Sequence, residues 1–304
     1  MLSYDKLSRK PLYFRSFTGL KVREFDDIYE KEILKKYGRH EVRRLSNRKD
    51  RERSMGAGRR FKLDVKDRFL MLLVYYRLYI TYTLAGFLFG LDQSSICRNM
   101  QKIEPLVRKC VPIPQKMYKT TKRLRTPEEV ERHFPGFLAF TDCTEQQIPR
   151  PKSKRRRKAY YSGKKKRHTV KTQLMVNTQG LVIHKTGHKK GRRHDYDIYK
   201  KNHPSTPKQV VNVFDLGYLG VEKDLPEQLS SLPNRKKRSR ELPQEEKEHN
   251  LQHAKKRIVI EHVICRLKKY RILSDLFRNK LKKHNTVSDI VAGLVNYRTM
   301  SQRN

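Results

Sequence analysis

The sequence predicts an α/β protein in which a helical, basic N-terminal region precedes a larger segment of alternating strands and helices. Two observations indicate this. From Leu63 to about Cys110 the apolar residues form helical faces, whereas from about residue 135 short apolar runs alternate with turns before a long periodic helix. The 304 residues are 36% hydrophobic and 34% charged, so the chain can bury a core beneath a charged surface.

The charge of the chain indicates a polyanionic partner. Its 72 Lys and Arg residues against 31 Asp and Glu residues give a net charge of +41 with His neutral. Such a one-sided field repels itself unless a polyanion meets it, and phosphate backbones release counterions when they bind this kind of surface. Nucleic-acid binding is therefore favoured, with a ribosomal or scaffold protein as the alternative.

Cysteine spacing and hydropathy argue against other classes of protein. No CxxC pair occurs, so neither a zinc knuckle nor a disulfide framework is expected for Cys97, Cys110, Cys143 and Cys265. No apolar run approaches the roughly 18 residues of a membrane span, and the N-terminus lacks a signal-peptide core. We expect a cytoplasmic, nucleoid-associated protein (nuclear in a eukaryotic host) without a membrane partner.

The first elements are expected to be helices. One should run over about 22–37, followed by a basic connector that ends in SMGAGRR. LDVKDRFLMLLVYYRLYI indicates a helix with Asp64 as its N-cap, and TYTLAGFLFG indicates a second, shorter helix. Gly90 can supply a left-handed turn, and Asp92 can cap a third helix, QSSICRNMQKI, which should end before Pro105.

The spacing of these helices fits a helix-turn-helix. Small Gly86 would lie where two helices cross, and Ile96 would be buried in the second of them. This orientation leaves four side chains facing outward, toward base edges and phosphates: Gln93, Ser94, Arg98 and Gln101. Asn99 fits poorly, because its position is usually apolar. A helical bundle that contacts no DNA is the alternative.

After a helix and a basic linker over about 104–135, four strands and two helices are expected. GFLAFTDCTEQQIP is a strand ending near Asp142, and HTVKTQLMVNT and LVIHKTGH are two more, joined at Gln179 and Gly180. QVVNVFDLGYLG is a fourth strand, which ends at Asp215 before a glycine-rich turn. LQHAKKRIVIEHVICRLKKY is a periodic helix with an apolar stripe, and HNTVSDIVAGLVNYR is a last amphipathic helix.

Three acidic residues in this segment are candidates for chemistry. An aspartate that closes an apolar strand is costly to bury unless it is paired or bound to a cation, so Asp142 and Asp215 indicate one shared site. Glu261 lies beside the apolar stripe and should sit near the core boundary. Oxygen ligands without Cys or His favour Mg²⁺ or Mn²⁺, and two such ions can drive an in-line displacement. Taken singly, each aspartate is explained by a turn or cap, and Glu261 by an ion pair with Arg257.

The chain resembles the insertion-sequence transposases of the family-5 type, in the DDE superfamily. The resemblance covers about residues 12–300, through FTGLKVREFD, GAGRRFKL, DCTEQQIPRP, YYSGKKKRHTVKTQ, the His194-Asp195 pair, FDLGYLG and RIVIEHVICRLKK, in the family's order. It implies an RNase H-like mixed-sheet core in which Asp142, Asp215 and Glu261 bind the two metal ions. It also implies cleavage at terminal inverted repeats, transfer of the 3′ ends into target DNA, and at least a dimer on DNA.

In this family an Arg stands four residues before the Glu and a Lys seven after it, which matches Arg257 and Lys268. On a helix of 3.6 residues per turn the three share one face, and phosphate positioning is assigned to the two cations. Related transposases have Tyr where this chain has Ala254, so the resemblance is weaker for the DNA-contact role of this face than for the metal ligands.

The segment 152–171 is dense in basic residues around Tyr160 and Tyr161. It is interpreted as a phosphate clamp that includes Lys164, Lys165 and Lys166, with a solvated hairpin as the alternative. Asp195 is expected to cap a helix rather than to bind metal. Glu145 is a further acid that could lie at the mouth of the site, and His194 is placed outside it.

These interpretations divide the chain into a helical and basic region at 1–62, a helix-turn-helix domain at 63–110, a linker at 111–134 and a catalytic domain at 135–304. Two other functions stay open. One is a transposase-derived DNA-binding protein without catalysis, against which the three filled acidic positions argue. The other is a metal-dependent endonuclease that lacks the joining step.

Overall fold

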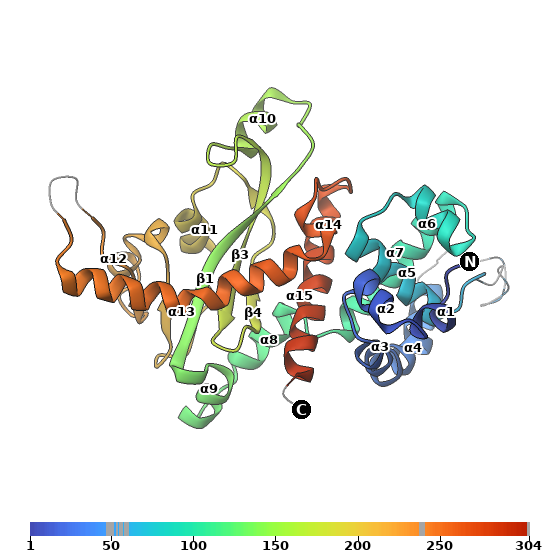
Figure 1. Cartoon of the computed structure of the whole chain (residues 1–304), viewed down its shortest axis with the longest axis horizontal. Helices are drawn as coiled ribbons and strands as arrows, with labels where there is room; N and C mark the ends of the chain where they lie inside the picture. The colour runs from blue at the N-terminus through green and yellow to red at the C-terminus, as the bar shows by residue number, and fades with distance from the viewer. Residues whose placement is uncertain (47–51, 53, 55–56, 58–60, 237–240, 303–304) are drawn as a thin grey trace.

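The computed structural model describes residues 1–46, 52, 54, 57, 61–236 and 241–302, and arranges them as a group of helices beside an α/β part (Figure 1). Most of the basic connector predicted before Phe61 lies outside these residues. The first helices are α1 (Tyr4–Ser8), α2 (Pro11–Thr18), α3 (Val22–Ile28), the π-helix η1 (Tyr29–Leu34), α4 (Lys35–Ser46), α5 (Val65–Leu78), α6 (Tyr82–Phe89), α7 (Gln93–Cys110), α8 (Pro114–Thr121) and α9 (Pro127–His133).

The α/β part begins after α9. Its strands are β1 (Leu138–Gln147), β2 (Tyr161–Ser162), β3 (Arg167–Asn177), β4 (Val182–Lys185), β5 (Lys189–Lys190), β6 (Val211–Val213) and β7 (Ser230–Ser231). Its helices are η2 (Pro135–Phe137), α10 (Lys154–Tyr160), α11 (Asp195–Asn202), η3 (Leu216–Tyr218), α12 (Val221–Asp224), α13 (Gln244–Lys268), α14 (Arg271–Ser274), η4 (Leu281–Lys283) and α15 (His284–Ser301).

Strand β1 is the centre of a mixed sheet. It pairs antiparallel with β3, which brings Asp142 opposite Leu174, and parallel with β6, which brings Phe140 opposite Val213. Strands β4 and β5 pair with β3, and β7 adds in parallel to β6. Helix α13 crosses the sheet and packs on β1 and β3 (Figure 1). The predicted fold class, a helix-turn-helix followed by an RNase H-like mixed sheet, is confirmed.

Several predicted element ends are wrong: the helix predicted over 22–37 continues to Ser46, and the strand predicted to end at Asp215 ends at Val213. Strand β1 does not end near Asp142 but continues to Gln147, because its polar residues pair with β3 as far as Thr169. Helix α7 does not end before Pro105 but runs through it to Cys110. Pro105 removes one helical hydrogen bond, and the fully buried apolar side chains on both sides of it, Ile103 and Leu106 among them, hold the helix together.

The turn of the helix-turn-helix has the predicted geometry. Asp92 caps α7 by accepting a hydrogen bond from the Ser95 amide at 2.7 Å, and Gly90 adopts a left-handed φ of +64°. A Cβ added at Gly86 would lie well within 3.0 Å of the Leu91 carbonyl oxygen, so only glycine lets the two helices approach this closely. The turn therefore depends on a backbone contact that side-chain repacking cannot relieve.

The one residue that fits the pattern poorly, Asn99, is satisfied only in part, because its buried Oδ1 has no hydrogen-bond partner. Asn99 is buried, and its Nδ2 donates to the Ser95 carbonyl oxygen one turn earlier at 2.8 Å. The backbone of the same helix thus provides a hydrogen-bond partner for the Asn99 amide nitrogen, which the surrounding apolar side chains cannot provide. Ile96 is fully buried, as predicted.

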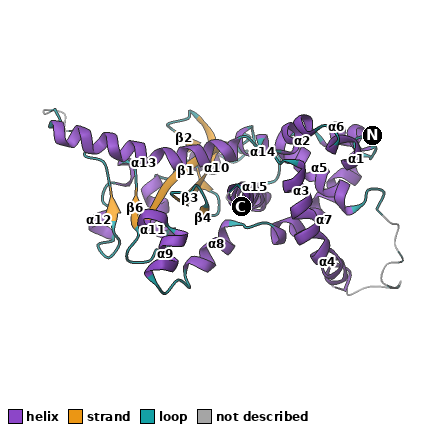
Figure 2. Cartoon of the chain, turned by 60° about the horizontal axis from the view of Figure 1, so that its bottom comes forward, coloured by secondary structure: helices purple, strands orange, loops and turns teal. Residues whose placement is uncertain are grey.

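Helix α15 joins the helical part to the sheet, and both views place it between them (Figure 2). Its Asp289 accepts from Arg108 of α7 at 2.9 Å and pairs with Lys185 of β4 at 3.0 Å. Its Asn296 donates to the Pro112 carbonyl oxygen at 3.0 Å and accepts from the Val182 amide at 2.7 Å. Because it is buried on both sides, α15 is not the amphipathic helix that was predicted.

Among the helices of the described residues, none combines the length and the apolar composition of a membrane-spanning segment.

Replacing Gly86 tests the turn. We expect Gly86→Ala to lower the free energy of unfolding by about 1–3 kcal/mol, because its Cβ would press on the Leu91 backbone. Gly38→Ala is the matched control: Gly38 lies in α4 with open space around it, so alanine should be neutral or stabilise by up to about 1 kcal/mol. Chemical denaturation measures both changes, and a Gly86→Ala protein as stable as the Gly38→Ala protein would contradict the close contact.

Candidate functional site

The parallel pairing of β1 with β6 brings two of the predicted acids together. Asp142 and Asp215 each stand two residues beyond the paired Phe140 and Val213, so they lie at the same level, Asp142 within β1 and Asp215 in the turn after β6. Both carboxylates meet Arg257 of α13, whose Nη2 lies 3.4 Å from Asp142 Oδ2 and 4.0 Å from Asp215 Oδ2. Two side chains that are 73 positions apart in the sequence therefore share one site.

The turn after β6 holds Asp215 in place. Its Oδ1 accepts a hydrogen bond from the Gly217 amide at 2.9 Å, and a Cβ at Gly217 would come equally close to that oxygen. Tyr218 is fully buried against Phe214, and its hydroxyl accepts from Gln173 of β3 at 2.9 Å. The DLGY turn is thus fastened to the sheet on the side away from the carboxylate.

The electrostatics of Asp142 favour a cation. Burial, followed by the negative charge of Asp215, raises the pKa of the Asp142 carboxyl to about 6, against a hydrogen bond from the Cys143 amide and the charge of Arg257. Two carboxylates held this close repel each other, and a divalent ion would remove the repulsion. Their hard oxygen atoms are the donors that Mg²⁺ and Mn²⁺ prefer, so the aspartate pair fits such an ion.

Glu261 does not join the pair in this structure. It lies on α13 one turn after Arg257, its side chain is exposed rather than at the core boundary, and it forms no ion pair with any described residue. The described part of the chain contains no group of three or more His, Cys, Asp or Glu placed to hold a metal ion. The alternative role predicted for Glu261, an ion pair with Arg257, is not observed either, because the guanidinium of Arg257 contacts Asp142 and Asp215 instead.

The predicted cap at Asp195 is wrong. His194 is the N-cap residue of α11, and Asp195 is its first residue, whose Oδ1 accepts from Lys171 Nζ at 2.8 Å instead of from a backbone amide. Lys171 also pairs with Glu145 at 3.5 Å, and the half-buried Glu145 lies on the sheet face opposite Asp142. The charge of Asp195 nevertheless contributes to the raised pKa of Asp142, which places this acid near the site.

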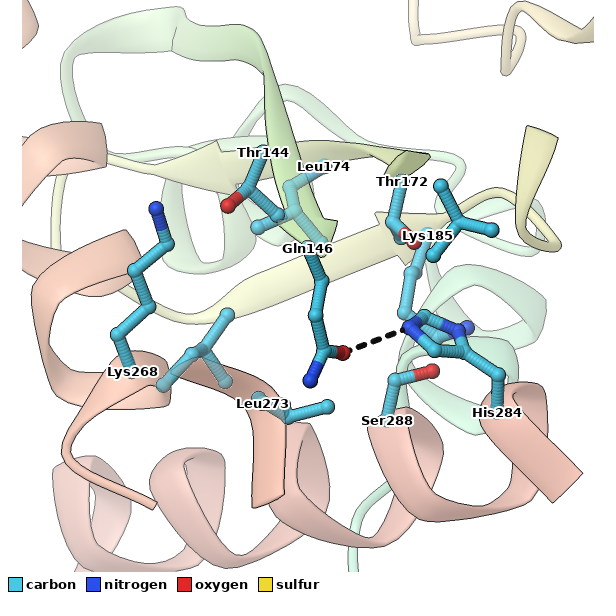
Figure 3. A pocket seen from close by; sticks show the side chains of 11 residues that line it. Thr144, Gln146, Thr172, Leu174, Lys185, Lys268, Leu273, His284 and Ser288 are labelled. Carbon is cyan, nitrogen blue, oxygen red and sulfur yellow. Dashed lines mark hydrogen bonds between the residues drawn. The ribbon is translucent and has the colours of Figure 1, made fainter. Parts of the chain in front are cut away.

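The predicted basic residues lie on two surfaces. Lys268 of α13 is half-buried beside a small cavity of about 30 Å³, which is also lined by Gln146 and His284 and by the hydrogen bond between them (Figure 3). Burial, followed by the charge of Lys165, lowers the pKa of Lys268, so the turn between β2 and β3 reaches toward the same side. In that turn the exposed side chains are Lys164, Lys165 and Lys166.

The second surface is the outer face of α7. As predicted, the exposed side chains there are Gln93, Ser94, Arg98 and Gln101. Arg98 donates to Ser95 Oγ at 3.2 Å and lies 3.9 Å from the capping Asp92, so its guanidinium is held near the start of the helix. The predicted outward orientation is confirmed, and contact with DNA stays a prediction.

Comparison with known proteins matches both parts of the chain. A family described as DDE superfamily endonuclease matches residues 141–296, and the helix-turn-helix of DDE superfamily endonuclease matches residues 61–113. The probable transposase for insertion sequence element IS702 of Microchaete diplosiphon is 35% identical over 250 residues, 82% of this chain and 86% of that protein. A protein of Streptomyces albus G assigned as transposase for insertion sequence element IS112 is 23% identical over 270 residues, 88% and 87% of the two chains. No solved structure matches.

The raised pKa of Asp142 predicts that this carboxyl group lowers the free energy of unfolding by an amount that depends on pH. Between about pH 4 and pH 6 the native state binds this proton and the unfolded state does not, so stability falls as the pH rises. We expect Asp142→Asn to match the unchanged protein near pH 4 and to exceed it by about 2 kcal/mol at pH 7 in EDTA.

Urea unfolding at several pH values measures this difference. Asp197→Asn, at an exposed position of α11, should show no such pH dependence. An Asp142→Asn protein that is less stable than the unchanged one at pH 7 would show that the site does not strain this carboxylate.

Proposed function

This chain belongs to the insertion-sequence transposases of the DDE superfamily, and we propose that it cleaves DNA at the ends of a mobile element and joins the 3′ ends to target DNA. The observation that carries the proposal is the convergence of Asp142 and Asp215 from neighbouring strands on one site under α13. DDE superfamily endonucleases generally use divalent metal ions, and the strained aspartate pair fits one.

The proposed metal ligands are Asp142, Asp215 and Glu261. The two aspartates are supported by their common level in the fold and by their shared arginine. Glu261 is supported by its position, because among the acids of α13 it is the nearest in sequence to Arg257, the residue that contacts both aspartates. When bound, a pair of Mg²⁺ or Mn²⁺ ions supplies an activated attacking oxygen and a stabilised leaving oxygen for in-line displacement.

The remaining roles fall to the basic and polar surfaces. The exposed face of α7 is proposed to recognise the element ends, and the other proposed phosphate-binding side chains are Lys164, Lys165, Lys166, Arg257 and Lys268. The proposed domains are the helix-turn-helix at 63–110 and the catalytic domain at 135–304, after the N-terminal region 1–62 and joined by the linker 111–134. Because two element ends must be brought together, we propose that the protein acts as a dimer or larger oligomer.

Removing one aspartate tests the catalytic assignment. We expect Asp215→Ala to reduce nicking of element-end DNA to background in Mg²⁺ while leaving the affinity for that DNA within about twofold, because the carboxylate is a ligand and not a DNA contact. Asp197→Ala removes an exposed acid from α11 and should cleave at the normal rate. Wild-type nicking by Asp215→Ala would refute the assignment.

The joining step is tested with pre-cleaved ends and a supercoiled target. A transposase gives ends covalently joined to the target, whereas an endonuclease without strand transfer gives only hydrolysed ends. Titration with Mn²⁺ covers the remaining alternative: a DNA-binding protein that has lost catalysis would show no metal binding that depends on the aspartates.

Two charge removals separate recognition from general affinity. Arg98→Ala, on the outer face of α7, should weaken binding to element-end DNA by about tenfold or more and affect unrelated DNA much less, because it lies where base edges are read. Lys165→Ala should weaken both DNAs about equally and reduce the salt dependence by about one phosphate contact. Competition binding at several salt concentrations measures both, and equal behaviour of the two variants would contradict the division of roles.

A further inference from the structure

Arg257 supplies the positive charge that meets both aspartates. Its Nη2 is shared between Asp142 Oδ2 and Asp215 Oδ2, and it is the one cation within ion-pair distance of either carboxylate in the described part of the chain. Its side chain is only 15% exposed, so water screens this interaction weakly. A metal ion bound between the two carboxylates would therefore lie close to the guanidinium of Arg257, and the two positive charges would repel each other.

The geometry of this contact is loose for a structural ion pair. A strong Arg–carboxylate pair uses two nitrogen atoms at about 2.7–2.9 Å. Arg108 approaches this with Asp289, at 2.9 Å through Nε and 2.7 Å through Nη2. Arg257 instead makes contacts of 3.4 and 4.0 Å through one nitrogen, and its buried Nε has no hydrogen-bond partner. The Arg257 contact can therefore be exchanged at lower cost than the Arg108 pair.

We propose that Arg257 is a placeholder cation: it neutralises Asp142 and Asp215 until a divalent ion binds, competes with that ion, and thereby sets the affinity of the aspartates for it. This inference rests on the proposed function, because it takes the two aspartates as metal ligands. A divalent ion and a guanidinium at the same two carboxylates repel each other, so binding of one weakens binding of the other. Release from the aspartates frees the guanidinium for a DNA phosphate.

A purely structural role predicts the opposite result. If Arg257 served only to hold the aspartates in place, its removal would let them move apart and would weaken metal binding. If it is a placeholder, its removal strengthens metal binding while the protein without metal becomes less stable. The affinity for Mn²⁺ in the absence of DNA therefore separates the two roles without any measurement of cleavage.

The experiment uses the full chain with Arg257→Gln, Arg257→Lys and the matched control Lys256→Gln, which removes a charge from the adjacent exposed position of α13. Electron paramagnetic resonance measures free Mn²⁺. We expect Arg257→Gln to bind Mn²⁺ about tenfold more tightly, a change of about 1.4 kcal/mol. Arg257→Lys should stay near the unchanged protein, because it keeps the charge, and Lys256→Gln should change affinity by about twofold or less.

Thermal unfolding gives a second readout. In EDTA the Arg257→Gln protein should melt below the Lys256→Gln protein, and saturating Mn²⁺ should raise its Tm by more than it raises that of the control. Weaker or equal Mn²⁺ binding by Arg257→Gln compared with Lys256→Gln would overturn the placeholder role.

Two further measurements keep the outcome decisive. If Arg257→Gln does not fold, the Nε–H resonance of Arg257 in the unchanged protein, assigned with Arg257→Lys, should shift on addition of Mg²⁺. An unmoved resonance while Mg²⁺ binds would overturn the proposal. If instead Mn²⁺ binding persists in Asp142→Asn with Asp215→Asn, the proposed metal site itself is wrong, and this failure is distinct from failure of the placeholder role.

Discussion

Asp142 and Asp215 place two carboxylates at the same level of adjacent parallel strands, because the pairing of β1 with β6 holds the segments that carry them side by side. Burial, followed by the negative charge of Asp215, raises the pKa of Asp142, so keeping this carboxylate ionised costs free energy. Other parts of the core bear on the same point: α13 brings Arg257 onto the carboxylates, and the buried Tyr218 fastens the turn that carries Asp215. The buried aspartate pair therefore lowers the stability of the fold locally and at the same time forms a site that attracts cations.

The same core fixes the direction of the helix that is proposed to read DNA. The outer face of α7 lies near its N-terminus, whereas Arg108, near its C-terminus, pairs with Asp289 of α15. Since Asp289 also pairs with Lys185 of β4, one buried carboxylate connects the recognition helix with the sheet. If α7 holds an element end as proposed, these contacts fix how that end is oriented relative to the aspartates of the same subunit.

Much of this was predictable from local patterns, and the exceptions share a physical cause. Apolar spacing and the Gly90 and Asp92 turn predicted the helix-turn-helix, because these features are decided within a few residues. The wrong ends of β1 and α7 arose because pairing with β3 and burial against distant segments outweigh polar residues and Pro105. A local pattern carries no record of such long-range contacts.

The candidate site divides in the same way. Apolar strands that end in an acid predicted Asp142 and Asp215 as a pair, since alternation and strand order limit where such acids can lie. The ion-pair partner of an arginine depends on distances in the folded protein. Helical spacing alone therefore suggested Glu261 as the partner of Arg257, whereas the observed partners are Asp142 and Asp215. The partner of Asp195 was missed for the same reason, because Lys171 reaches it from another strand.

The excess of positive charge acquires a specific role beside this acidic pair. A DNA phosphate approaching two carboxylates is repelled unless cations on the same side outweigh them. Lys268 lies half-buried on the Asp142 face, where burial and then the positive charge of Lys165 lower its pKa. These lysines cannot take the place of a metal ion, because Asp142 contacts only Arg257 among the cations of the described chain. In the proposed function, attraction of the phosphate by lysines and binding of an ion by carboxylates are therefore separate requirements, which fall to different elements of the fold.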